Sequence, residues 1–90
     1  MIIAKFELGT VVVTTAVLEK TSEFDQMAAL NAHANCNWGS ISAEDQLANE
    51  NGLEHGDRLF SVHVTSNNCL VWVITEADRS VTTMLMPEDY

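Results

Sequence analysis

Apolar and polar positions alternate most clearly in the second half of the chain. Around residue 60, Phe60, Val62 and Val64 fall on one side and polar side chains fall on the other, a period of two that predicts a half-buried β-strand. The next run is apolar on both sides, as a central strand is, and a third, β-branched run ends at Pro87, which cannot donate to a ladder. Short polar turns separate the runs and predict an antiparallel meander. The expected strands span residues 58–65, 69–75 and 81–86.

The first half of the chain combines a β-branched run with helical patterns. Residues 10–15 have no helical period and predict a strand or an extended segment, which either joins the meander as a fourth strand or stays outside it; residues 16–20 suffice for one helical turn. From an N-cap signature at Ser22, apolar side chains follow at helical spacing to about His33. The apolar face expected for this helix consists of Phe24, Met27, Ala28 and Leu30.

A second long helix is expected after a turn-rich segment at residues 35–40. The capping signature repeats at Ser42, and Gly56 stands where a left-handed C-terminal cap belongs. The apolar stripe between them is narrow, so this helix should lie on the surface. The sequence therefore predicts a single α+β domain over residues 1–90. An antiparallel sheet of three C-terminal strands, which the N-terminal strand either joins or does not, packs against two or three short helices.

Composition narrows the classes of function. The 90 residues carry thirteen acidic and four basic side chains, a formal net charge of −9, which repels polyanions and argues against nucleic acid as a direct partner. The apolar runs fall far below the roughly 18 residues of a membrane span, and residues 1–5 lack the features of a secretory signal. We therefore expect a cytoplasmic protein without a membrane partner. The acidic charge serves solubility or, alternatively, docking on a basic partner protein.

No cofactor or metal site is predicted. The two cysteines should be free thiols, because a cytosolic chain with 47% hydrophobic residues does not require a disulfide. Zinc sites typically show two close pairs of ligands, whereas only one pair lies three residues apart here. The residues considered as ligands are His33, Cys36, His55, His63 and Cys69.

No catalytic residue is predicted either. The pairs with the residue types for nucleophilic catalysis are Cys36 with His33 and Ser61 with His63. Same-face neighbours on a strand lie about 7 Å apart, beyond hydrogen-bond reach unless a long side chain bridges them. The histidines are interpreted as ordinary surface residues.

The candidate binding residues lie in two turns. Glu76, Asp78 and Arg79 surround a polar turn, either as an acid–base or binding group or, alternatively, with Asp78 capping the turn and Arg79 bonding Glu76 or a neighbouring strand. Trp38, in an Asn-rich loop, either completes the core or anchors an interface.

The C-terminal residues 72–90, WVITEADRSVTTMLMPEDY, resemble the ending "WIITEADRSxTTxLLPEEY" of a family of small bacterial proteins carried on plasmids and other mobile elements. Residues 6–9 resemble its "FxLG" opening, residues 37–39 its "DWG", and residues 44–50 the start of its "EDxxANExAL" helix. Asn37 and Asp89 depart from the pattern. Members are often labelled plasmid-related protein or type I restriction endonuclease subunit M, but 90 residues are too few for a methyltransferase fold. The resemblance implies a mobile-element setting and no particular reaction.

These observations favour a non-enzymatic accessory protein that acts by protein–protein binding, with an acidic inhibitor of a host defence or DNA-processing protein as the sharper variant. A homodimer would form most simply through an edge strand, either 81–86 or 11–15. The alternative is a small-molecule-binding domain or minor enzyme with a pocket between sheet and helices, lined by Trp38, Phe60 and Trp72.

Overall fold

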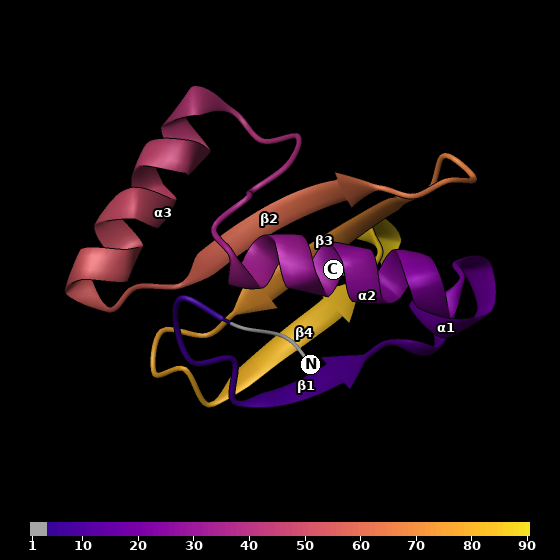
Figure 1. Ribbon diagram of the computed structural model, residues 1–90, viewed down its shortest axis with the longest axis horizontal. Helices are drawn as coiled ribbons and strands as arrows, with labels where there is room; N and C mark the ends of the chain where they lie inside the picture. Colours follow the sequence, from indigo (N-terminus) through magenta and orange to yellow (C-terminus); the bar gives the residue numbers. More distant parts are fainter. Residues whose placement is uncertain (1–3) are drawn as a thin grey trace.

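The computed structural model describes residues 4–90 and shows an α+β architecture, as expected (Figure 1). The expectation that the N-terminus lacks a secretory signal rests on residues 1–5, and residues 1–3 lie outside the described part of the chain. The strands are β1 (Thr10–Val13), β2 (Leu59–Val64), β3 (Leu70–Thr75) and β4 (Val81–Leu85). The helices are α1 (Thr15–Lys20), α2 (Glu23–Ala34), α3 (Ala43–His55) and the short 3₁₀ helix η1 (Pro87–Asp89).

The sheet is mixed, with strand order β1-β4-β3-β2. The predicted antiparallel meander of β2, β3 and β4 is confirmed. The N-terminal strand joins it parallel to β4, with Thr10 opposite Val81 and Val13 opposite Met84. Because β4 is paired on both sides, the expectation that residues 81–86 offer an edge for dimerisation is wrong. Of the two proposed edges, only β1 stands at a margin of the sheet.

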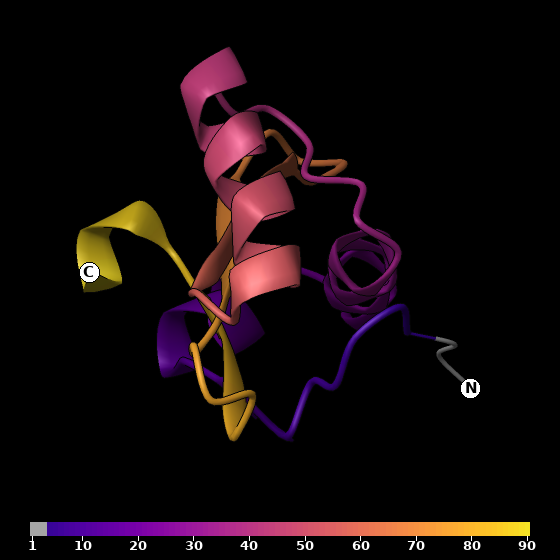
Figure 2. The same cartoon turned by 90° about the vertical axis from the view of Figure 1, so that its left-hand side faces the viewer.

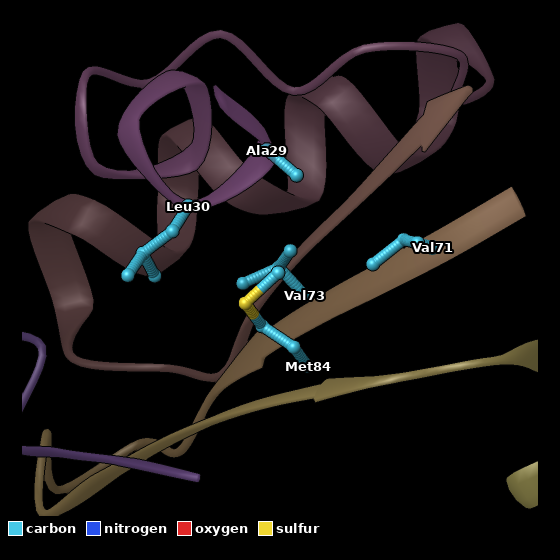
Figure 3. Close-up of a cluster of buried hydrophobic side chains, with 5 residues drawn as sticks. All are labelled: Ala29, Leu30, Val71, Val73 and Met84. Atoms are coloured by element: carbon cyan, nitrogen blue, oxygen red, sulfur yellow. The ribbon is translucent and has the colours of Figure 1, made fainter. Parts of the chain in front are cut away.

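Helix α2 lies across one face of the sheet and builds the core (Figure 3). Its Ala29 and Leu30 pack against Val71 and Val73 of β3 and Met84 of β4, all between 0% and 7% exposed. Alanine at the contact brings the helix close to the β-branched surface beneath it. The core therefore sits between α2 and the two central strands.

The apolar face predicted for α2 is largely wrong. Phe24 is 81% exposed and Met27 is 53% exposed, whereas the buried side carries Leu30 together with His33 and Ala34. The physical reason is that His33 finds hydrogen-bond partners inside the sheet, so a polar side chain shares the buried face with alanines. Two large apolar side chains are left in contact with solvent.

Strand β2 alternates as predicted, but its polar face is the deeply buried one. Ser61 faces α2 and is fully buried, while Phe60 on the opposite side is only half-buried and Val64 is 54% exposed. On that second face, α1 and η1 form a partial cover, and Figure 2 shows both on the side of the sheet away from α2. The cover leaves the Phe60 region accessible.

The outer edge of β2 is covered by other parts of the chain. The side-chain amide of Asn49 in α3 donates to the Phe60 carbonyl at 2.7 Å and accepts from the Phe60 N–H at 3.0 Å. Segment 38–40 pairs with Val62 through main-chain bonds of 2.8 and 3.1 Å. Gly39 permits this approach, since a Cβ there would lie 1.9 Å from the Val62 carbonyl oxygen. An edge covered in this way does not recruit foreign strands.

The helix ends follow the predicted chemistry. Ser22 and Ser42 accept hydrogen bonds from the third residue beyond them, and Gly56 adopts φ 76° at the end of α3. Within residues 4–90, no helix is both long and apolar enough to cross a lipid bilayer.

Candidate functional site

The four residues proposed for binding do not converge on one concavity. Asp78 closes the β3–β4 turn, because its Oδ1 accepts from the N–H and the hydroxyl of Ser80 at 3.0 and 2.6 Å. These two bonds hold the pKa of Asp78 below its usual range. The capping role considered for Asp78 is confirmed.

Arg79 ties this turn to the end of α3. Its Nη1 donates to the carbonyl oxygens of Asp57 at 2.7 Å and Glu76 at 3.1 Å, and its Nη2 donates to that of Gly52 at 3.0 Å. A cation at a helix C-terminus is favourable because the carbonyl end of the helix dipole carries partial negative charge. Arg79 itself takes φ 61° to reach them and lies over the ring of Phe6. Its guanidinium is committed to internal contacts.

Trp38 completes the core on the α2 side. Its indole is 4% exposed, stacks on Phe6 with ring centroids 6.2 Å apart, and meets His33 edge to face at 5.6 Å. Within residues 4–90 its buried N–H has no hydrogen-bond partner. The proposed pocket lined jointly by Trp38, Phe60 and Trp72 is not formed, because Trp38 belongs to the opposite side of the sheet.

A pocket does form on the second face of the sheet. Phe60 of β2 and Trp72 of β3 meet edge to face at 5.3 Å, and Tyr90 meets Trp72 at 5.5 Å. With Ile74 and Arg58 these rings line a mostly apolar cavity of about 280 Å³, which we call the aromatic pocket. Tyr90, which follows η1, forms its outer wall and is 70% exposed.

The rim of the aromatic pocket is charged. Arg58 donates from Nη1 to the Tyr90 hydroxyl at 3.1 Å, and its guanidinium lies 5.7 Å from the centre of the Tyr90 ring. Its Nε lies 3.6 Å from the carboxylate of Glu76, and both side chains are about half exposed. Glu76 does not line the pocket, but it is the one predicted binding residue that contacts its wall, because its carboxylate pairs with Arg58 at the rim.

A chain of buried hydrogen bonds crosses the α2 side of the sheet. Ser61 Oγ lies 2.9 Å from His63 Nε2 and 2.6 Å from His33 Nδ1, and His33 Nε2 lies 2.9 Å from Thr75 Oγ1. Thr75 contacts the Thr82 hydroxyl at 2.7 Å, and Thr82 donates to the Leu8 carbonyl. These residues, together called the histidine chain, link α2 to three strands.

The Leu8 carbonyl at the end of the histidine chain can only accept, and this determines the position of every proton in the chain. Because the Thr82 proton goes to Leu8, Thr75 must donate to Thr82, and His33 must donate from Nε2 to Thr75. His33 Nδ1 then accepts from Ser61, which in turn accepts from His63 Nε2. Both imidazoles are neutral Nε2–H tautomers, and the chain runs one way, from His63 inward. It stabilises structure and offers no route for a proton beyond Leu8.

Burial keeps His33 neutral. Removal from water lowers the pKa of His33 to about 3, with smaller contributions from repulsion by His63, when that ring is protonated in acid, and by Arg79; burial lowers the pKa of His63 as well. The expectation of ordinary surface histidines is wrong for His33, which is fully buried. The Ser61–His63 pair is within hydrogen-bonding distance because the long imidazole side chain bridges the gap, which is the exception that the sequence analysis allowed. Ser61 is fully buried and cannot meet a substrate.

The remaining candidates show no shared site. Cys36 and Cys69 are free thiols, as predicted, and burial raises the pKa of Cys36. Among residues 4–90, no three side chains of the metal-binding types are grouped so as to hold an ion.

Phe60 and Trp72 lie in one pocket, as predicted from the sequence, but that prediction wrongly adds Trp38 as a third wall. It misses Tyr90 and Arg58, which reach these two rings only through the fold, because no local motif joins the four residues. The one usable signal was aromatic spacing on adjacent strands. No protein-family model, curated protein or solved structure matches this chain. The proposal for its function therefore rests on the chemistry of the sites described above.

Proposed function

We propose that this chain is a non-enzymatic binding protein that acts by protein–protein contact through the aromatic pocket. The observation that carries the proposal is the grouping of Phe60, Trp72 and Tyr90 with Arg58 on a face that α1 and η1 cover only in part. Tryptophan, tyrosine and arginine are the residues that most often dominate binding energy at interfaces. A partner side chain inserted between the rings would be shielded from water by Tyr90.

The negative charge of the chain supports a partner with a basic surface. The chain has a formal net charge of −9, and Glu76 stands at the rim of the pocket, so a partner with a basic surface would be attracted over a distance of about one Debye length, some 8–10 Å at physiological salt. A protein whose basic groove takes nucleic acid has such a surface. The sharper proposal is therefore an acidic inhibitor of a host defence or DNA-processing protein, encoded by a mobile element, the setting implied by the resemblance of residues 72–90.

A small-molecule ligand of the same pocket is the second candidate function. The cavity of about 280 Å³ lies just below the usual range for ligand sites, and three aromatic walls with one guanidinium suit a flat, partly anionic molecule. An enzyme is less well supported, because Ser61, the nucleophile within reach of a histidine, is fully buried.

The test compares two exposed aromatic side chains on different parts of the surface. Tyr90→Ala removes the outer wall of the pocket, and Phe24→Ala is the matched control, since Phe24 is 81% exposed and belongs to α2 on the other face. Immobilised wild-type chain and both variants are incubated with a bacterial host lysate at low salt, and bound proteins are identified by mass spectrometry. We expect a basic protein that wild type and Phe24→Ala retain and Tyr90→Ala loses.

Two outcomes would overturn the proposal: recovery of no protein at low salt, or equal recovery by Tyr90→Ala. Thermal-shift screening against aromatic carboxylates separates the second candidate, because a ligand at 100 times its dissociation constant adds about 2.7 kcal/mol to the free energy of unfolding. A shift that Tyr90→Ala abolishes, without any captured protein, would favour the small molecule.

A further inference from the structure

Strand β1 presents unpaired main-chain groups at the free margin of the sheet. Thr10 and Thr14 donate their main-chain N–H to the carbonyls of Ser80 and Met84, each at 3.0 Å. Because these directions alternate along a strand, Val11 and Val13 point their N–H and C=O away from β4. Within residues 4–90 no strand pairs with that outer side.

The side chains at this margin are uncharged. Strand β1 holds only threonine and valine, in a chain of net charge −9, and Val11 and Val12 are 38% and 41% exposed. Beside it, an apolar cavity of about 220 Å³ opens between β1 and α2, with Val13 and the half-exposed Met27 in its wall. Proteins usually protect an exposed edge with charge, proline or a covering segment, as Asn49 does for β2. As far as residues 4–90 show, strand β1 has none of these protections.

We propose that β1 pairs with β1 of a second copy of this chain, antiparallel about a two-fold axis at Val12. Val11 would then face Val13 of the second copy, and Val13 would face Val11, each pair exchanging both N–H···O=C bonds. All outward groups of both valines are satisfied by this register. Val12 would lie opposite its own counterpart as a pair that shares no hydrogen bonds.

Self-complementarity is the reason for choosing a second copy as the occupant. The outward groups belong to two residues that are symmetric about Val12, and the side chains that would meet are valines on both faces. Glu23 lines the cavity beside β1 in each copy, and each chain has a formal net charge of −9. The two copies therefore repel each other at long range, and salt should strengthen the dimer.

The first experiment removes only the outward main-chain donor. Val11→Pro deletes an N–H that β4 does not use, and its φ near −65° suits an edge position. Val11→Thr is the matched control, because it keeps both the N–H and the β-branched shape. Sedimentation velocity over a concentration series at low and high salt should show a dimer for wild type and Val11→Thr, tighter at high salt, and a monomer for Val11→Pro with unchanged circular dichroism.

The second experiment reads the register without requiring that a proline variant folds. In a chain with Cys36 and Cys69 replaced by serine, Val12→Cys should form an intermolecular disulfide on mild oxidation, because residues 12 and 12 of the two copies face each other as a closely spaced pair. Val11→Cys, opposite residue 13, should not.

The outcomes are distinct from those for the aromatic pocket, which lies on the second face of the sheet and away from β1. A wild-type chain that stays monomeric at all concentrations would overturn the dimer, as would a dimer that persists in folded Val11→Pro or cross-links at residue 11 rather than 12. A dimer that weakens with salt would rest on ion pairs and would also contradict pairing through an uncharged edge.

Discussion

Acidification should destabilise this protein mainly through His33, and His33→Gln should remove that effect. The variant is chosen for geometry: the amide oxygen of glutamine accepts from Ser61 and its amide nitrogen donates to Thr75, as the two ring nitrogens of His33 do. Glutamine does not titrate. The two proteins should therefore have similar stability at pH 7.5 and differ in acid.

The magnitude follows from the pKa of His33, which is about 3 in the folded chain and about 6.5 when unfolded. Between these values the unfolded chain binds a proton that the folded chain does not, so the free energy of unfolding falls as the pH falls. At about 1.36 kcal/mol per unit, roughly two units from pH 6.5 to 4.5 remove about 2.7 kcal/mol. The stability is fully present above pH 6.5 and is lost on the way down to pH 3.

The effect of His33 on stability can be separated from that of the carboxyl groups by the pH range over which each titrates. His63 has a lowered pKa and acts in the same direction as His33, so it adds to the loss in both proteins. Three carboxyl groups have pKa values below the ordinary 3.8, those of Asp25, Asp78 and Asp89. The stability that they contribute is lost only as the pH falls below that ordinary pKa. The interval from pH 6.5 to 4.5 therefore reports on histidine.

The assay is urea unfolding at pH 7.5, 6.5, 5.5 and 4.5, followed by tryptophan fluorescence. Wild type should lose about 2.7 kcal/mol more than His33→Gln across the series. Nitrogen NMR of the imidazoles should show His33 as a neutral Nε2–H tautomer throughout. Parallel losses in the two proteins, or a His33 ring that charges near pH 6, would refute the reasoning.

Two further substitutions test contacts that hold the sheet and α3 together. Arg79→Ala should lower the free energy of unfolding by about 2–3 kcal/mol, because it leaves the carbonyls of Gly52 and Asp57 without their charged donor. Urea denaturation should show a smaller loss for Arg79→Lys. Equal losses would mean that the two-pronged guanidinium contact is not used. Asn49→Ala should cost about 1–3 kcal/mol and speed hydrogen exchange of the Phe60 amide, whereas unchanged exchange would show that α3 does not protect the β2 edge.

Much of the local structure could be predicted from the sequence because its causes are local. Ser22 and Ser42 cap the N-termini of their helices, and Gly56 caps a C-terminus, each through a group three or four residues away. Asp78 closes its turn through Ser80, two residues further along the chain. The strands were predictable for the same reason. Alternation and β-branched runs depend on neighbouring positions alone.

What depends on distant residues could not be predicted. Pattern alone assigned Phe24 and Met27 to the buried face of α2, but His33 occupies that face because Ser61 and Thr75, 28 and 42 residues away, supply its hydrogen bonds. The resulting burial of a polar face turns Phe60 toward the opposite side of the sheet.

The sequence by itself determined the α+β class, the acidic charge, the helix caps and the positions of the strands. The tertiary structure decided the strand order, which places β4 inside the sheet and leaves β1 at its margin, and it brought Tyr90 and Arg58 to Phe60 and Trp72. The reason is that pairing partners and packed faces are selected by the fit of whole elements, which no short stretch of sequence contains.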